Sequence, residues 1–311
     1  MNPITFVDTE IDPQSHRILD IGSIRSDGST FHKASVTDFI SFLNGTKYAC
    51  GHNILRHDIK FIGEALTVAG IDSSNIIDTL FLSPLLFPSK PYHALLKDDK
   101  LQTEDMNNPL NDSIKARDLF NDEEAKFKEI DKDIQQIYYL LLHNQPEFRA
   151  FFRFIGFFSQ ESDPETLIRQ KFRNEICDHA DFARIISSQP VELAYCLSLI
   201  VSFIDHPELQ SVTPPWVLKN YPEVERIMFL LRNRPCISGC VWCNKALDIR
   251  LGLKRHFGFD SYRSFGGEPL QEQAVKAAIY NKSLLAVFPT GGGKSLAFQV
   301  PALMSGENVQ G

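Results

Sequence analysis

The sequence comprises 311 residues, of which 43% are apolar and 11% aromatic, so it is long enough to bury two hydrophobic cores. Its formal net charge of −7 excludes a surface that is basic throughout and binds nucleic acid non-specifically, so any contact with nucleic acid must be local. Six unevenly placed cysteines, with neither a signal peptide nor an apolar run of transmembrane length, predict reduced thiols, a cytoplasmic location and no membrane partner.

The first predicted strand carries two acidic residues. Asp8 and Glu10 follow an apolar lead-in and lie two positions apart, so they share one face of a strand. An apolar run over 18–24 predicts a second strand, and Asp27-Gly28 predicts a hairpin turn after it. A solvated polar edge would have this pattern too, but two carboxylates that converge at a sheet edge are suitable ligands for divalent cations.

Two further acidic motifs follow. The segment 51–58, Gly-His-Asn-Ile-Leu-Arg-His-Asp, ends in Asp58 ahead of an apolar helical stretch, and Asp78 opens another segment. Together with Asp8 and Glu10, these motifs resemble those of the DnaQ-like, DEDD-type 3′→5′ exonucleases. The resemblance covers residues 4–122. It implies an α/β fold, with a ribonuclease H-like domain (a mixed sheet flanked by helices) over residues 1–122.

The resemblance calls for a fourth carboxylate, and two residues compete for that role. Asp98 has the His-x4-Asp spacing from His93, whereas Asp112 leads an amphipathic helical run and is favoured. If Asp112 is the ligand, Asn107 stands where the family has its histidine base, and an amide cannot take a proton from the attacking water. Either His93 then reaches the site from its own segment, or the metal-bound water reacts without a side-chain base. The alternative interpretation of His93 is an ordinary surface histidine.

The resemblance implies a role for each of these side chains. Asp8, Glu10, Asp58 and Asp112 would hold two Mg²⁺ or Mn²⁺ ions, which activate water and stabilise the leaving 3′ oxygen. His93 is the candidate catalytic base. The substrate would be single-stranded or partly unwound DNA with a 3′ end. A rival hypothesis is a nuclease fold that binds 3′ ends without cutting them. Asn107 in place of the histidine base favours this hypothesis.

The middle of the chain, residues 123–235, shows helical periodicity and predicts a helical linker domain. Its phenylalanines over 148–158 are more typical of a core than of base stacking. Residues 236–256 form a separate cysteine segment. Its Cys-x3-Cys-x2-Cys spacing suits tetrahedral Zn²⁺, with an iron–sulfur cluster or metal-free thiols as alternatives. The zinc ligands expected are Cys236, Cys240 and Cys243, with His256 or Cys177 as the fourth.

The C-terminal part carries a phosphate-binding pattern. The apolar run 284–288 predicts a strand, and a glycine-rich loop follows whose N–H groups can turn toward phosphate. The loop residues expected to bind nucleotide are Thr290, Gly291, Gly292, Gly293, Lys294 and Ser295. The loop resembles motif I of RecQ-family helicases, and Gln271, 23 positions before Lys294, resembles that family's adenine-reading glutamine. Residues 257–311 are therefore expected to begin a helicase lobe that binds ATP.

Only the beginning of such a lobe precedes residue 311, so we expect ATP-driven unwinding only in a longer parent protein. Unwinding there would feed a 3′ end into the nuclease. The prediction is thus a 3′→5′ exonuclease joined to a RecQ-like helicase, with a role in DNA repair, recombination or defence.

Overall fold

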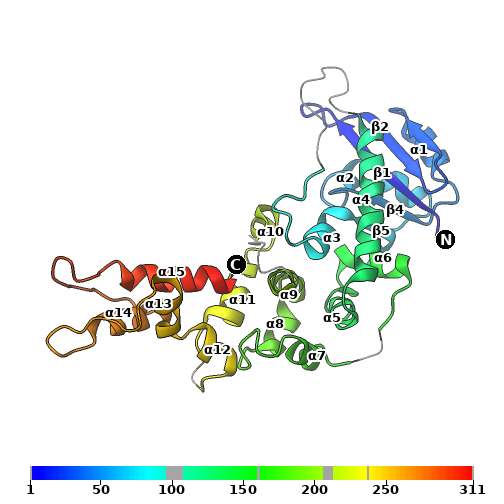
Figure 1. Cartoon of the computed structure of the whole chain (residues 1–311). Coiled ribbons are helices and arrows are strands. Elements are labelled where there is room, and N and C mark those ends of the chain that lie inside the picture. The colour runs from blue at the N-terminus through cyan, green and yellow to red at the C-terminus, as the bar shows by residue number, and fades with distance from the viewer. Residues whose placement is uncertain (1, 96–107, 160–161, 206–212, 237, 310–311) are drawn as a thin grey trace. The chain divides into compact units, whose positions relative to one another are not determined.

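The computed structural model describes residues 2–95, 108–159, 162–205, 213–236 and 238–309 (Figure 1). The chain divides into two compact units, Met1–Ser162 and Asp163–Gly311. The helix that crosses residue 122, where the first domain was expected to end, continues to Glu129. The first unit therefore includes the beginning of the segment that was expected to be a linker.

The first unit contains a five-stranded mixed sheet with the strand order β3-β2-β1-β4-β5. Neighbours β1, β2 and β3 are antiparallel, whereas β1, β4 and β5 run parallel. The predicted strands and the turn at Asp27-Gly28 are confirmed, and Gly28 adopts a positive φ of 87° there. The strands are β1 (Ile4–Ile11), β2 (Ile18–Arg25), β3 (Thr30–His32), β4 (Tyr48–Gly51) and β5 (Ile76–Asp78).

Helices cover both faces of this sheet. Phe6 and Val7 are consecutive on β1 and both buried, so they point to opposite faces. Val7 packs with residues of α1 and α2, whereas the Phe6 ring lies 5.7 Å from that of Phe120 on α4. The predicted α/β class is confirmed. The helices are α1 (Val36–Phe42), α2 (Ile59–Val68), the 3₁₀ turn η1 (Ser73–Asn75), α3 (Thr79–Leu86), α4 (Pro109–Glu129), α5 (Lys132–Leu142) and α6 (Pro146–Ile155).

The phenylalanines of α6 belong to the core of the first unit. Phe148, Phe151 and Phe152 are buried, and Phe151 meets Phe120 and Phe127 of α4 edge to face. These rings bury apolar area and fix α6 against α4. They are therefore not presented for stacking on bases.

The second unit is mainly helical. One of its cores joins thiols of the cysteine segment to residues of α13, α14 and α15, among them Cys240, Trp242, Leu253, Val275 and Val300. The cysteine segment and the nucleotide-binding segment therefore share one core. The helices are α7 (Pro164–Lys171), α8 (Phe182–Ser188), α9 (Pro190–Asp205), α10 (Pro215–Asn220), α11 (Glu223–Met228), the π-helical turn η2 (Phe229–Asn233), α12 (Val241–Ala246), α13 (Ile249–Phe257), α14 (Leu270–Ile279) and α15 (Leu296–Val309).

The strand predicted over 284–288 is not formed, and that prediction was wrong. Leu285 is 91% exposed and Val287 78% exposed. A strand needs a neighbour to pair its main-chain groups. From Asp163 onward the described residues contain no strand, only an isolated bridge between Phe265 and Glu268. The apolar run therefore lacks a partner and stays irregular.

No single helix in the described part of the chain has both the length and the apolar composition needed to cross a membrane. The pair Phe182–Ser188 and Pro190–Ile204 meets that requirement only when taken together, and the chain bends by 118° between them.

Candidate functional site

Asp8 and Glu10 lie near the end of β1, on the face of the sheet that α4 covers. They share that face with Phe6, whose ring meets Phe120 of α4. Both acidic residues are partly exposed, whereas Thr9 between them is buried on the other side of the strand. The β1 carboxylates therefore sit between the sheet and α4 without being sealed from solvent.

The first turn of α4 approaches β2 directly beside Asp8. Gly22 of β2 is the cross-strand neighbour of Asp8. A β-carbon at Gly22 would overlap the main chain of Pro109 and Leu110, so only glycine permits this close approach. Asp112 lies in the same first turn. The fold thus brings Asp112 toward the face that carries Asp8 and Glu10.

Asp112 has a positive neighbour on its own helix. The Nζ atom of Lys115 lies 3.8 Å from Asp112 Oδ1, and both side chains are partly exposed. The competing residue Asp98, and Asn107 in the position of the expected histidine, lie outside the described residues.

Asp58 lies against Thr9, whose side chain points to the opposite face of β1 from Asp8 and Glu10. β1 pairs with β4 only over Ile4–Phe6, so the edge of β1 beyond Phe6 has no strand beside it. The main-chain N–H and the hydroxyl of Thr9 both donate to Asp58 Oδ1, at 3.0 and 2.6 Å. Asp58 is 1% exposed, and this burial raises its pKa against the opposing effect of the Thr9 hydrogen bonds.

The turn that carries Asp58 is fixed by Asp78, a role that the sequence analysis did not assign. Asp78 accepts hydrogen bonds from the main-chain N–H groups of Asn53 (2.8 Å), Leu55 (3.0 Å) and Leu80 (2.9 Å). It therefore caps α3 and clamps the 53–58 turn at once. Burial raises its pKa to about 7 in spite of these donors. An Asp-Thr pair before an apolar helix is the signal that predicts such a cap.

His93 is buried and is not a surface histidine. It is 5% exposed, and its Nδ1 lies 2.8 Å from Ser83 Oγ on α3. Burial lowers its pKa to about 4, with a smaller contribution from Lys90. His52, whose Nδ1 lies 2.9 Å from Thr79 Oγ1, also has a pKa of about 4 because of burial and the nearby His93. Both imidazoles are therefore neutral at pH 7.

The predicted carboxylates do not form a tight cluster. Among the residues that the structure describes, one group of at least three Cys, His, Asp and Glu ligand atoms lies within 4.8 Å of one another. That group belongs to the cysteine segment, and none of the four predicted carboxylates is part of it. In this arrangement Asp58 is engaged by Thr9 and Asp112 lies near Lys115.

The glycine loop that is predicted to bind nucleotide is held by Gln271, which is 1% exposed. Its Oε1 accepts from the main-chain N–H of Arg263 (2.9 Å), and its Nε2 donates to the carbonyl of Gly293 (2.9 Å). The Arg263 guanidinium donates to the carbonyl of Gly291 (2.9 Å). Gln271 and the glycine loop are therefore neighbours, and both ends of the Gln271 amide are engaged in hydrogen bonds.

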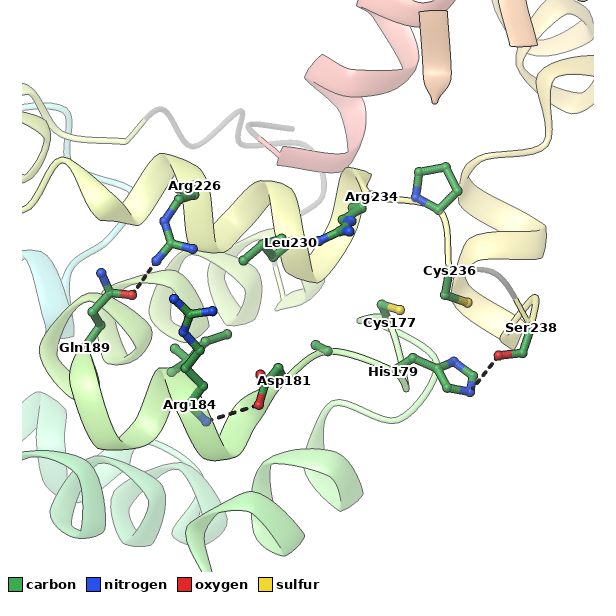
Figure 2. A pocket seen from close by; sticks show the side chains of 13 residues that line it. Cys177, His179, Asp181, Arg184, Gln189, Arg226, Leu230, Arg234, Cys236 and Ser238 are labelled. Atoms are coloured by element: carbon green, nitrogen blue, oxygen red, sulfur yellow. Dashed lines mark hydrogen bonds between the residues drawn. The ribbon is translucent and has the colours of Figure 1, made fainter. Parts of the chain in front are cut away.

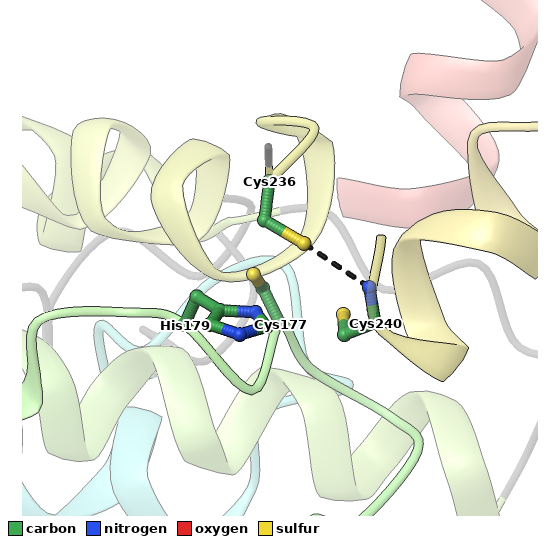
Figure 3. A group of neighbouring side chains, drawn as sticks. All are labelled: Cys177, His179, Cys236 and Cys240. Atoms are coloured by element: carbon green, nitrogen blue, oxygen red, sulfur yellow. Dashed lines mark hydrogen bonds between the residues drawn. The ribbon is translucent and has the colours of Figure 1, made fainter. Parts of the chain in front are cut away.

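The cysteine segment is joined by a second segment far away in the sequence. The clustered ligand atoms belong to Cys177, His179, Cys236 and Cys240 (Figure 3). The thiol of Cys243 lies beside them, and its hydrogen bond lowers the pKa of Cys177 to about 5. Of the two candidates for the fourth ligand, Cys177 belongs to this group, whereas His256 does not, and its Nε2 lies 3.3 Å from a carboxylate oxygen of Glu307. None of the six cysteines forms a disulfide.

A cavity of about 460 Å³ lies next to this cluster (Figure 2). Cys177, His179 and Cys236 form part of its wall, together with Arg184, Arg226 and Arg234. Of these arginines, Arg226 donates to Gln189 (2.6 Å) and to Glu223. Three guanidinium groups on one wall concentrate positive charge locally in a chain whose net charge is negative.

Comparison with known proteins links part of the chain to RecQ-family helicases. A segment is 43% identical over 58 residues to ATP-dependent DNA helicase Q5 from Rattus norvegicus, covering 18% of this chain and 6% of that protein. A segment of 75 residues is 36% identical to ATP-dependent DNA helicase Q-like SIM from Arabidopsis thaliana, covering 24% of this chain and 8% of that protein. A segment is also 38% identical over 69 residues to ATP-dependent DNA helicase RecQ from Haemophilus influenzae, covering 22% of this chain and 10% of that protein.

The matched segments thus cover at most a tenth of these helicases' own length. They support a RecQ helicase region within this chain. No protein-family model matches the chain. No solved structure matches it either.

Proposed function

We propose that the chain is a metal-dependent 3′→5′ exonuclease of the ribonuclease H-like type, joined to the N-terminal start of a RecQ-like helicase. The observation that carries the nuclease proposal is the position of α4. Its first turn, with Asp112, packs on Gly22, the cross-strand neighbour of Asp8. This close approach supports the proposal that Asp112 acts together with Asp8 and Glu10, and the hydrogen bonds from Thr9 support Asp58 as a further ligand.

The donor set suits the ions that such a nuclease needs. Carboxylate oxygens are the ligands that Mg²⁺ and Mn²⁺ prefer, and Asp8, Glu10, Asp58 and Asp112 would provide them. Two such ions supply the activation of water and the stabilisation of the leaving 3′ oxygen. The protein orients the ligands: Thr9 holds Asp58, and Lys115 offsets negative charge beside Asp112.

A specific observation favours a second candidate function, a nuclease fold that binds 3′ ends without cutting. A general base has to come within hydrogen-bond reach of the water that it deprotonates. His93 instead packs against Ser83 of α3, and burial is the main cause of its low pKa. In this alternative the acidic face would bind DNA ends through the metal ions alone.

Digestion of a 5′-labelled single-stranded oligonucleotide with Mn²⁺ distinguishes the two functions. The exonuclease proposal expects stepwise shortening from the 3′ end, which Asp8→Ala abolishes. Asp12→Ala is a control for general loss of acidity, because Asp12 lies outside the site and accepts hydrogen bonds from the main chain of its own turn. Retention of the intact oligonucleotide in a Mn²⁺-dependent complex, without shortening, would favour the binding module.

For the C-terminal segment we propose ATP binding as part of a RecQ-like helicase region. The similarity to RecQ helicases and the Gln271–Gly293 contact support this assignment. Lys294 would contact the β- and γ-phosphates, and Ser295 would bind Mg²⁺. Fluorescence titration with a labelled ATP analogue should show weak binding that Lys294→Ala removes and Lys282→Ala keeps. Equal binding by both variants would contradict the proposed loop.

A further inference from the structure

Two segments that are far apart in the sequence meet at the cysteine cluster. Cys177 and His179 lie in the loop between α7 and α8, and Cys236 and Cys240 precede α12 (Figure 3). One ligand atom from each of these residues lies within 4.8 Å of the other three. Three sulfurs and one imidazole nitrogen from two distant segments therefore converge on a single point.

The local structure holds both segments in place. The main-chain N–H of Cys177 donates to the carbonyl of Leu231 in η2 (2.7 Å), which anchors the loop. The N–H of Cys240 donates to Cys236 Sγ (3.2 Å), and the N–H of Cys243 donates to Cys240 Sγ (3.5 Å). Hydrogen bonds to sulfur favour the thiolate, which is the form that binds metal.

We propose that Cys177, His179, Cys236 and Cys240 bind one Zn²⁺ ion as a closed structural site with three thiolates and one imidazole. Zn²⁺ prefers four tetrahedral ligands of this kind. The Nε2 atom of His179 lies 3.2 Å from Ser238 Oγ, which leaves Nδ1 for the ion. A hydrogen bond from the second ring nitrogen is the usual way in which a zinc-bound histidine is oriented.

Cys243 lies next to this group without belonging to it. Its Sγ lies 3.7 Å from the carbonyl oxygen of Arg234 and is not one of the four mutually close ligand atoms. The proposed ligand set therefore contains Cys177 and His179 in place of Cys243 and His256.

The ion would fasten the loop after α7 to the start of α12. Cys177, Cys240 and Trp242 share a core with Leu253 of α13 and Val300 of α15. Loss of the ion should therefore loosen the part of the second unit that leads into the glycine loop. This inference is independent of the proposed nuclease, whose ligands lie in the first unit.

The experiment uses the whole 311-residue chain, purified without added metal. We expect about one equivalent of zinc by mass spectrometry. X-ray absorption of the unmodified protein should give three Zn–S distances of about 2.3 Å and one Zn–N distance of about 2.0–2.1 Å. Because this measurement needs no substitution, it remains informative even where a variant fails to fold.

Variants then identify the ligands. His179→Asn and Cys240→Ser should each lower the zinc content and the melting temperature. His256→Asn and Cys196→Ser are the matched controls, one for each ligand type, and both should keep the zinc. Metal-free protein, iron with acid-labile sulfide, or four sulfur neighbours without nitrogen would overturn the proposal. So would full zinc content in His179→Asn combined with its loss in Cys243→Ser.

Discussion

The two candidate metal sites are built in opposite ways. The acidic site of the first unit takes Asp8 and Glu10 from a single strand, and hard carboxylate oxygens are its donors. The thiol site of the second unit takes its ligands from two segments, and soft sulfur atoms dominate it. The thiol ligands already lie within 4.8 Å of one another, whereas the carboxylates do not. A closed site suits a structural ion, and a more open one suits ions that meet a substrate.

The largest expected effect separates the two sites by function. Asp112→Ala should reduce exonuclease activity by at least about 10³-fold, because ligands that act as a unit fail together. It should leave the zinc content unchanged. Cys240→Ser should show the reverse pattern. Asp118→Ala, an exposed carboxylate on the same helix paired with Arg117, is the control for Asp112. If Asp112→Ala and Asp118→Ala lost activity equally, the proposal that Asp112 is a metal ligand would be contradicted.

A glycine tests whether the approach of α4 matters. Gly22→Ala should push the first turn of α4 away from β2, because the new methyl group would overlap Pro109 and Leu110. We expect destabilisation of about 1–3 kcal/mol and an activity loss of about 100-fold without any change of a ligand. Chemical unfolding and oligonucleotide digestion measure the two effects. Gly63→Ala is the control, since its methyl group would meet only the Ile59 side chain at 3.3 Å.

Asp78→Asn tests the clamp behind Asp58. The amide has a single acceptor oxygen, so its NH₂ group would face one of the main-chain donors of Asn53, Leu55 or Leu80. The free energy of unfolding should fall by about 2–3 kcal/mol. Asp72→Asn, at the exposed cap of η1, should change it by less than about 0.5 kcal/mol. Similar values for both substitutions would argue against the clamp.

The last of these effects concerns pH and is small for each pH unit. Glu123 is fully buried, neither of its carboxylate oxygens has a hydrogen-bond partner among the described residues, and burial raises its pKa well above 4.5. The folded protein therefore keeps a proton that the unfolded chain releases. The contribution of Glu123 to the free energy of unfolding is greatest at low pH and falls as the pH rises from about 4.5 toward the raised pKa, by up to about 1.4 kcal/mol per unit.

Glu123→Gln should remove this contribution, so urea unfolding between about pH 5 and 8 should show a shallower slope. Glu124→Gln, which alters the neighbouring residue that pairs with Lys128, should keep the slope of the unmodified protein. Asp78, with a pKa raised to about 7, adds a slope of the same sign to both variants. An unchanged slope in Glu123→Gln would mean that this carboxyl is not the group responsible.

Local patterns in the sequence predicted the parts that depend on neighbours in the chain. The alternation around Asp8 and Glu10 predicted their shared face, and Asp27-Gly28 predicted the hairpin turn. His179 escaped notice because its partners in the cysteine segment lie far along the chain, although the Cys177-x-His179 pair was a usable signal. The surface interpretation of His93 was wrong because its burial depends on packing against Ser83, which a local sequence pattern does not report.

The uncovered apolar run 284–288 has a consequence for the protein in solution. Leu285 and Val287 expose most of their surface, and the main chain beside them has no neighbouring strand among the described residues. Such a segment is a template for pairing with the same segment of another molecule. The chain in isolation should therefore self-associate as its concentration rises, and a charged substitution such as Val287→Lys should improve its solubility.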